Sequence, residues 1–134
     1  MARHAEGGYA AVWVVFVAAA MLAVAGLVID GGYVMSAKRD AERVAEQAAR
    51  AAADQLDVGK LRSGEQEIEP RQAAQAARDY LAHTDMRGTV HVAGNDVVVE
   101  VTGHQESVIL SAFGKSAWTV HGSARASGID ESGG

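Results

Sequence analysis

The sequence contains no cysteine, so a disulfide framework, thiolate catalysis and a zinc–thiolate site are all excluded. It contains one proline, and aromatic residues make up only 5% of its 134 residues. A chain this short and this poor in aromatic side chains favours helices with flat, close-packed faces over the bulky core of an enzyme. The formal net charge of −5 provides no basic surface that would recruit nucleic acid.

Residues that can carry catalysis or bind a metal are present, but they form no constellation. The five histidines show neither HxxxH nor HxH spacing, and no serine lies in a GxSxG motif. His91 and His121 both fall on the polar faces of expected strands, where a solvated face is favoured over a metal site. The sequence therefore predicts no enzyme, no catalytic residue, no metal and no cofactor.

Charge is absent from residues 9–29, a run of 21 residues. A helix over this run is about 31 Å long, which matches a bilayer hydrocarbon core of about 30 Å. Ala23-Val24-Ala25 before Gly26 is similar to a signal-peptide cleavage site. The apolar part of a signal peptide is usually only about 7–15 residues long, however. We therefore expect a retained transmembrane anchor rather than a cleaved signal.

Small residues form a stripe along the expected anchor. Ala19, Ala23 and Gly26 recur at i, i+4 and i+7, so they share one helical face. Such stripes let the backbones of neighbouring membrane helices approach closely. The alternative is a chance alignment in an alanine-rich span.

Basic residues lie on both sides of the anchor. Arg3 precedes it, whereas Lys38, Arg39 and Arg43 follow it. A simple count would keep the C-terminal part in the cytoplasm, but that rule loses force for a tail of roughly a hundred residues. Charge alone leaves the orientation open.

The helical pattern continues beyond the anchor to about Leu56. Small apolar residues recur there at spacings of three and four, which predicts a narrow face for packing against a sheet or a neighbouring helix. These helix-packing residues are Ala37, Ala41, Val44, Ala48 and Ala52. Asp30, Gly31 and Gly32 predict a hinge at the membrane exit, because glycines weaken a helix. Asp30 is either a hydrated interfacial carboxylate or the partner of a basic group on a neighbouring subunit.

The C-terminal half predicts a second helix and a hairpin. Pro70 suits the first position of a helix, where its missing N–H costs nothing. Gly94-Asn95 suits a two-residue hairpin turn, which would pair Val90 with Val99 and Val92 with Val97. This register places the apolar side chains of both strands on one face.

A short helical segment over residues 107–114 and a third strand, alternating over residues 118–126, complete the pattern. The predicted class is α+β, with a transmembrane helix continuing into a long amphipathic helix, a second helix and a small antiparallel three-stranded sheet. The expected parts are the tail and anchor (1–30), the juxtamembrane helix (31–57), a loop (58–69), the second helix and sheet (70–126) and a flexible tail (127–134).

The N-terminal third resembles the TadE/TadG-like family of tight-adherence (Flp) pilus assembly proteins. The resemblance is clearest over residues 6–53, and the order of the C-terminal strands is similar as well. It is carried by Glu6-Gly7-Gly8-Tyr9-Ala10-Ala11-Val12, by the apolar span, by Gly26-Leu27-Val28-Ile29-Asp30-Gly31-Gly32-Tyr33, and by the alanine-rich run at 37–53.

The resemblance implies a single-pass protein of the cell membrane with an extracytoplasmic C-terminal domain and a pseudopilin-like role in pilus assembly or secretion. Its expected partners are the lipid bilayer, other pilus assembly membrane proteins or pilin-like subunits, and further copies of the chain. Prepilin-peptidase substrates typically carry glutamate at the fifth position after the cleaved glycine, whereas Trp13 or Val12 stands there in this sequence. This departure favours an uncleaved assembly component. The alternative function is a membrane-tethered or secreted ligand-binding module that uses the sheet face bearing His91, Glu100 and His121.

Overall fold

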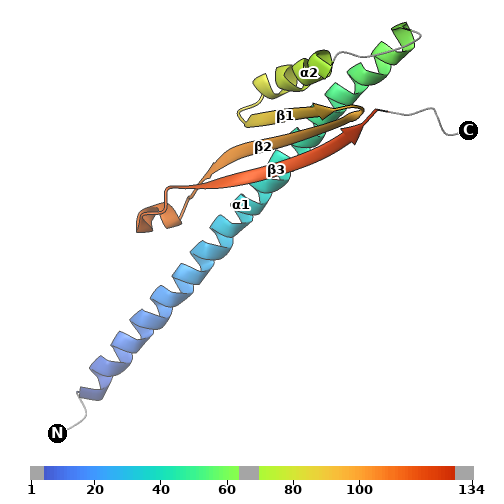
Figure 1. The fold of residues 1–134 in the computed structure, drawn as a ribbon. Helices are drawn as coiled ribbons and strands as arrows, with labels where there is room; N and C mark the ends of the chain where they lie inside the picture. The colour runs from blue at the N-terminus through green and yellow to red at the C-terminus, as the bar shows by residue number, and fades with distance from the viewer. Residues whose placement is uncertain (1–4, 64–69, 129–134) are drawn as a thin grey trace, which may run out of the picture.

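The computed structural model describes residues 5–63 and 70–128 (Figure 1). Its elements are, in chain order, α1 (Ala5–Ser63), α2 (Pro70–Ala82), β1 (Arg87–Ala93), β2 (Asp96–Glu106), the 3-10 helix η1 (Leu110–Phe113) and β3 (Ala117–Ser127). The predicted α+β class with a three-stranded antiparallel sheet is confirmed. The segments expected as anchor and juxtamembrane helix form one continuous helix of 59 residues.

The sheet has the strand order β1-β2-β3. A two-residue turn at Gly94-Asn95 joins β1 to β2, and Gly94 has a φ of 61°, a region that hairpin turns need and that glycine enters without steric cost. Val90 lies opposite Val99 and Val92 lies opposite Val97, so the predicted register is confirmed. The apolar side chains of the hairpin therefore share one face.

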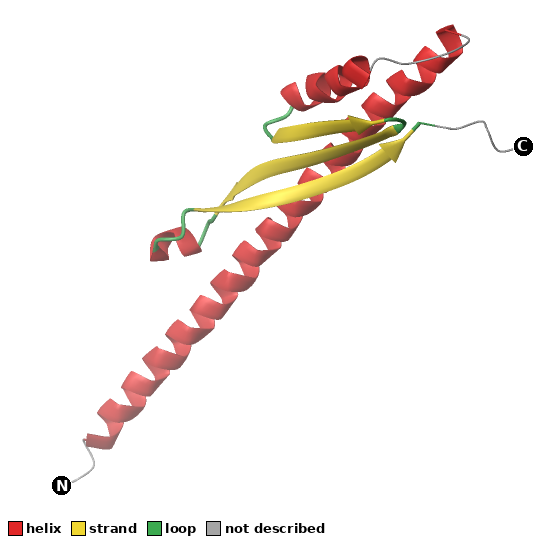
Figure 2. Ribbon diagram, viewed as in Figure 1, coloured by secondary structure: helices red, strands yellow, loops and turns green. Residues whose placement is uncertain are grey.

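Both helices cover that apolar face, which gives the domain two layers (Figure 2). α1 packs against β2 and β3, whereas α2 packs against β1 and against the side of α1. Valines from the sheet meet alanines from the helices in the core. The buried members are Ala37, Ala41, Ala45, Ala48, Ala49, Ala52, Leu56, Ala73, Ala77, Leu81, Val97, Val99, Val101 and Val120.

α1 and β3 approach each other closely at Gly122. A Cβ atom on Gly122 would lie 2.4 Å from the backbone carbonyl carbon of Ala41 and 2.4 Å from the backbone nitrogen of Glu42. Real Cβ atoms essentially never show contacts under 3.0 Å, so only glycine fits here. A glycine within a strand commonly marks such a close approach of another backbone. The helix therefore lies almost directly on the strand.

Several boundaries differ from the sequence-based expectation, and the short helix expected over residues 107–114 is limited to η1 at Leu110–Phe113. α1 continues to Ser63, although residues 58–69 were expected to form a loop, and β3 ends at Ser127, one residue beyond the expected limit. Lys60, Leu61 and Arg62 are good helix formers, and a single glycine at 59 costs a helix only about 1 kcal/mol. The rest of the expected loop (64–69) and most of the expected tail (129–134) lie outside the described residues.

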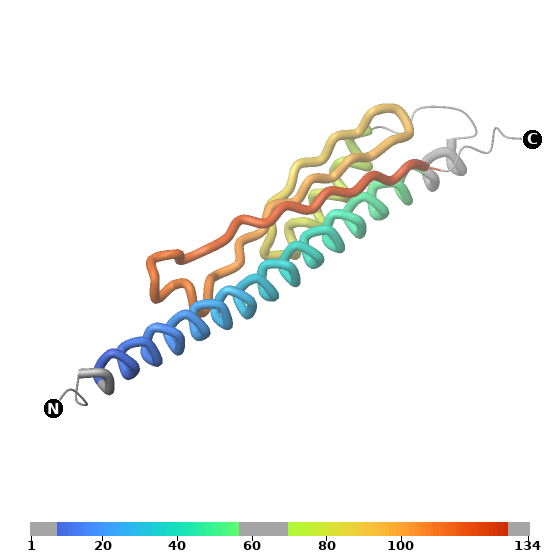
Figure 3. Tube along the Cα trace, turned by 90° about the horizontal axis from the view of Figure 1, so that it is seen from below, coloured from blue at the N-terminus to red at the C-terminus, as the bar shows by residue number. Residues whose placement is uncertain are grey.

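The sheet and α2 cover only the C-terminal half of α1. The N-terminal half extends past the sheet, and the loop that contains η1 is the part of the domain that reaches furthest toward it (Figure 3). Within the described residues, α1 therefore has one half inside a small domain and one half that meets the domain only near its end, at Gly26 and Asp30.

Candidate membrane anchor and its junction with the domain

The uncovered half of α1 exposes apolar side chains around the helix. Trp13, Phe16, Leu22 and Val28 each expose more than half of their surface, and Leu22 exposes 74%. α1 is the one helix in the described part of the chain that is long and apolar enough to cross a membrane, judged by length and composition. A soluble protein would bury such side chains, because exposure of a large apolar side chain to water costs about 1.5–3 kcal/mol.

The small-residue stripe of this half continues into the face that carries the domain. At about 100° per residue, Ala19, Ala23, Gly26, Asp30 and Ala41 all project into a sector of about 60° around the helix axis. Ala19 and Ala23 are exposed, whereas Gly26, Asp30 and Ala41 are buried. One face of α1 is therefore lined by small residues from the anchor up into the core.

Gly26 is buried by a residue from the far end of the sequence. A Cβ atom on Gly26 would lie 2.7 Å from Cγ2 of Ile109, the residue that precedes η1. The missing side chain thus leaves room for Ile109 against the last turn of the apolar span. Of the three residues in the predicted stripe, one is already used for packing within the chain.

Asp30 lies one turn further along and holds the same loop. Its carboxylate accepts hydrogen bonds from the backbone N–H groups of Val108 (3.1 Å), Ile109 (3.1 and 3.3 Å) and Leu110 (2.7 Å). Only 2% of the Asp30 surface is exposed. A carboxylate with three N–H donors retains its charge although it is screened from water. The structure thus gives Asp30 a partner within its own chain, so Asp30 is neither the hydrated carboxylate nor the intersubunit partner considered from the sequence.

The hydrogen bond from Leu110 contributes most to lowering the pKa of Asp30 below its usual value of 3.8. Burial opposes this effect, and the hydrogen bonds from Ile109 and Val108 reinforce it. Asp30 is therefore ionised at neutral pH, and the ionised form is the one that holds the loop.

Gly31 and Gly32, predicted as part of a hinge, lie within the unbroken helix. Apart from the neighbouring helix backbone, no atom of the described residues would lie within 4 Å of a Cβ at either position. The loop contacts α1 at Gly26 and Asp30 before this pair, and the sheet contacts it at Ala41 beyond. The hinge remains a prediction, and the domain bridges the two glycines.

The predicted packing face of the juxtamembrane half is occupied. Ala37, Ala41, Ala48 and Ala52 are buried, and Val44 packs at the edge of the same core. Their neighbours are the sheet and α2 of this chain. Bulky substitution at Ala41 or Ala48 would therefore disturb the domain itself, so these positions do not form a surface that is free for partners.

The comparison with known families matches this same helix. Residues 8–55 fit the family described as "Putative Flp pilus-assembly TadE/G-like". This segment, called here the TadE/G-like segment, is similar to that family. The resemblance drawn from the sequence is thereby confirmed for most of α1, and no curated protein or solved structure matches the chain.

The TadE/G-like segment contains the exposed apolar half, the glycine pair and the buried alanine face, whereas the sheet lies outside the match. A pilus-assembly family and a candidate membrane helix together support a pilus-related membrane component. The family is one of assembly proteins rather than of enzymes.

The uncovered face of the sheet carries polar residues, among them His91, Glu100 and His121. His91 lies opposite Val98, and His121 lies opposite Thr102 and contacts its hydroxyl at 3.3 Å. Val98 and Thr102 are about 13 Å apart along β2, and β2 separates the two outer strands, so the sheet does not bring the histidines together. Among the described residues, no cluster of histidine, aspartate and glutamate side chains is suited to a metal ion.

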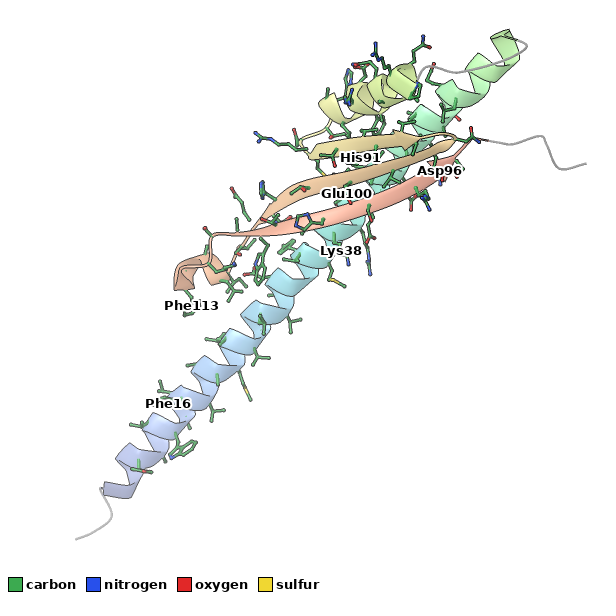
Figure 4. All side chains as sticks on the ribbon, viewed as in Figure 1. Phe16, Lys38, His91, Asp96, Glu100 and Phe113 are labelled. Carbon is green, nitrogen blue, oxygen red and sulfur yellow. The ribbon has the colours of Figure 1, made fainter. Side chains whose placement is uncertain are left out.

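A shallow groove of about 700 Å³ lies at this part of the domain. It is lined by Lys38 and Glu42 from α1, by Arg87 from β1, by Glu100 from β2 and by His121 from β3. Its lining carries charges of both signs, so the groove has no pronounced preference for an anion or a cation. His91 and Glu100 lie on neighbouring strands of the sheet in Figure 4.

Two parts of the junction escaped the sequence reasoning. The donors to Asp30 are backbone N–H groups, which every residue other than proline carries, so residues 108–110 have no side-chain signature. Gly122 did have a signal, because it is a glycine at an inward position of an alternating strand, between Val120 and Ala124.

Proposed function

We propose that the protein is a single-pass, membrane-anchored, pseudopilin-like component of a Tad/Flp-type pilus assembly or secretion apparatus. The observation that carries the proposal is the division of α1 into an exposed apolar half and a half that is buried in a small domain. A bilayer is the solvent that such an apolar half requires. The TadE/G-like match covers both halves.

The proposed orientation places the sheet domain outside the cytoplasm. The family supports this orientation, and the basic residues after the span do not oppose it strongly. The positive-inside rule depends on lysine and arginine near short loops, and it loses force for a C-terminal tail of roughly a hundred residues. The basic residues after the span therefore do not decide the orientation.

Within the membrane, we place the contacts with partner helices on Ala19 and Ala23. These two residues lie on the small-residue face and are exposed in the chain by itself. The alanines of the other half are buried in the domain, so we assign lateral association with partner helices to the anchor. Close backbone packing between membrane helices is the contact that such residues favour.

The first experiment measures the mass and membrane partition of the mature protein, together with protease access to its C-terminus on cells stripped of outer wall layers. A full-length, membrane-bound protein with an accessible C-terminus supports the proposal. Loss of about 25 residues would indicate a secreted product. A protected C-terminus would contradict the proposed orientation.

A pair of substitutions separates association from folding. Ala23→Leu should weaken co-purification with pilus assembly partners and leave the domain's stability unchanged, because Ala23 is exposed. Ala48→Leu should destabilise the domain by about 2 kcal/mol, because Ala48 is fully buried. Val24→Leu, one position off the stripe, is the matched control. Normal co-purification of the Ala23→Leu protein would contradict the proposed contact between Ala23 and partner helices.

The second candidate function is a membrane-tethered binding module, and the groove at the sheet favours it. Glu100→Gln and His121→Ala would then abolish function while Ala23→Leu would not. NMR spectra of the protein in detergent micelles, recorded with an extract of the cell envelope, provide the test. Unchanged signals from Glu100 and His121 would eliminate this candidate.

A further inference from the structure

We propose that the loop formed by residues 107–116, called here the interfacial loop, inserts into the surface of the bilayer beside the anchor. The partner is therefore lipid, in the region where acyl chains meet headgroups. The inference rests on the proposed function in one respect, namely that residues 9–29 cross the membrane.

The depth of the interfacial loop follows from its contacts with α1. Ile109 packs on Gly26, which lies three residues, or about 4.5 Å, inside the end of the apolar span at Ile29. Asp30 then fixes the loop through the N–H groups of residues 108–110. A bilayer that takes up the span to Ile29 must therefore meet the loop at the same level.

The chemistry of the loop suits that level. Residues 107–114 carry no charge, Phe113 exposes 77% of its surface, and Val108 exposes 59%. In the described part of the chain, Tyr80 is the only other exposed large hydrophobic residue outside α1. Exposed apolar residues of the domain are thus concentrated at the end nearest the anchor.

Phe113 lies at the tip of the loop, at the end of the domain that faces the Phe16 side and opposite the end with Asp96 (Figure 4). An apolar side chain at such a tip enters the boundary region of a bilayer, about 5–10 Å deep in interfacial helices. The same side chain would be exposed to water if the domain stood clear of the membrane.

The polar limit of the loop is marked by Lys115 and Trp118. The Lys115 ammonium lies 4.6 Å from the centre of the Trp118 ring. Lysine and tryptophan both favour the headgroup region, where an apolar body and a polar end can each find suitable surroundings. The order along the chain, apolar tip first and Lys115 next, matches the order from acyl chains to headgroups.

Lipid, rather than a second copy of the chain, is the occupant because the apolar tip is continuous with the exposed anchor. Any bilayer that surrounds residues 9–29 reaches the loop at Gly26 without a further binding event. A second copy would have to meet this same surface while lipid already lies beside it.

The test uses the absence of cysteine, which lets a single introduced cysteine carry a spin label. Ala112→Cys places the label next to Phe113 on an exposed position. Phe16→Cys reports on the anchor, and Ser123→Cys reports on the exposed outer face of the sheet. The full-length protein is placed in nanodiscs of phosphatidylcholine and phosphatidylglycerol, one chain per disc. Collisions with oxygen, which is enriched in lipid, are compared with those of a water-soluble nickel complex.

We expect oxygen to dominate at residues 112 and 16 and nickel to dominate at residue 123. Adding Phe113→Ser and Val108→Ser to the Ala112→Cys protein should shift its label toward nickel. Tyr80→Ser is the matched control and should cause no shift, because Tyr80 lies on α2.

A label at 112 as accessible to nickel as the label at 123, with residue 16 still in lipid, would overturn the inference and leave the anchor intact. Nickel access at residue 16 would instead refute the proposed function. Shielding of residue 112 only in discs with two copies would also overturn the inference, since the occupant would then be a second chain.

Discussion

Residues 8–29 and residues 37–56 belong to one helix, yet the apolar side chains of the first segment are exposed and those of the second are buried. The first segment exposes its large residues, with Leu22 at 74%, while the second encloses alanine, with Ala41 at 0%. A protein in water is expected to do the reverse, because large apolar residues contribute most when they are buried.

The difference shows that the two segments are adapted to different surroundings. In the second segment, burial depends on small size, since Gly122 brings the backbone of β3 almost onto that of α1. In the first segment, hydrophobicity itself is the requirement, because lipid is expected to surround the side chains. The following substitutions test this contrast, beginning with the largest expected effect.

A charge should be tolerated in one segment and rejected in the other. We expect Leu22→Arg to oppose membrane insertion by about 3 kcal/mol. Gln47→Arg, on an exposed position of the second segment, should have no effect on insertion. The retained fraction after carbonate extraction measures both, and equal retention would contradict the division of α1.

A single methyl group should disturb the second segment at its contact with β3. Gly122→Ala should lower the free energy of unfolding by about 2 kcal/mol, because the new Cβ would meet the backbone of Ala41 and Glu42. Alanine is normally favoured over glycine in a strand, so the sign of the effect is diagnostic. Ser123→Ala is the control, and urea unfolding in detergent micelles is the measurement. Equal urea midpoints for the wild-type and Gly122→Ala proteins would mean that α1 can move away from β3 without a loss of stability.

The junction between the segments should loosen when Asp30 loses its charge. Asp30→Asn should raise hydrogen exchange at the N–H groups of residues 108–110 by about tenfold. Asp40→Asn, an aspartate elsewhere on α1, should leave these amides unchanged. Unaltered exchange in the Asp30→Asn protein would show that Ile109 alone holds the loop.

The hydrogen bonds to Asp30 also predict that hydrogen exchange at residues 108–110 depends on pH. The pKa of Asp30 is lower in the folded protein than its usual value of 3.8, so its stabilising contribution is complete above that value and is lost as the pH falls through the folded pKa. The difference in exchange between wild type and Asp30→Asn should therefore narrow as the pH falls below 3.8 and through the lower folded pKa. A difference that persists at the acidic end would contradict the role of the carboxylate.

The smallest effect concerns the solvated side of the second segment. Arg50 and Glu46 form an exposed i, i+4 ion pair with a separation of 3.8 Å. Arg50→Gln should cost about 0.3 kcal/mol at low salt and nothing measurable at 1 M salt. A loss that is independent of salt would indicate a packing role for the Arg50 side chain.

Much of the fold could be predicted because its signals are local. The spacing of Ala37, Ala41 and Ala48 marks the buried face of the helix, and Gly94-Asn95 fixes the register of the hairpin. The end of α1 was less predictable, because Gly59 suits the end of a helix, whereas the good helix formers around it continue the helix to Ser63.

The junction could not be predicted to the same degree. Asp30 and its three donors are 78–80 residues apart in sequence, and an aspartate that binds backbone N–H groups leaves no paired residue to find. The sequence did identify Asp30 as an unusual acid at the end of an apolar span. Its partners, the N–H groups of residues 108–110, are identified only by the structure, which places the loop beside Gly26.

The bridge across Gly31 and Gly32 has a mechanical consequence. The domain contacts α1 at Gly26 and Asp30 on one side of the glycine pair and at Ala41 on the other, so it supports the helix across the predicted hinge. Tilting the anchor by about 20°, an ordinary tilt for a membrane helix, would then swing the far end of α1, about 50 Å away, through about 17 Å. A modest tilt of the anchor thus becomes a large displacement of the far end of the domain, as with a lever.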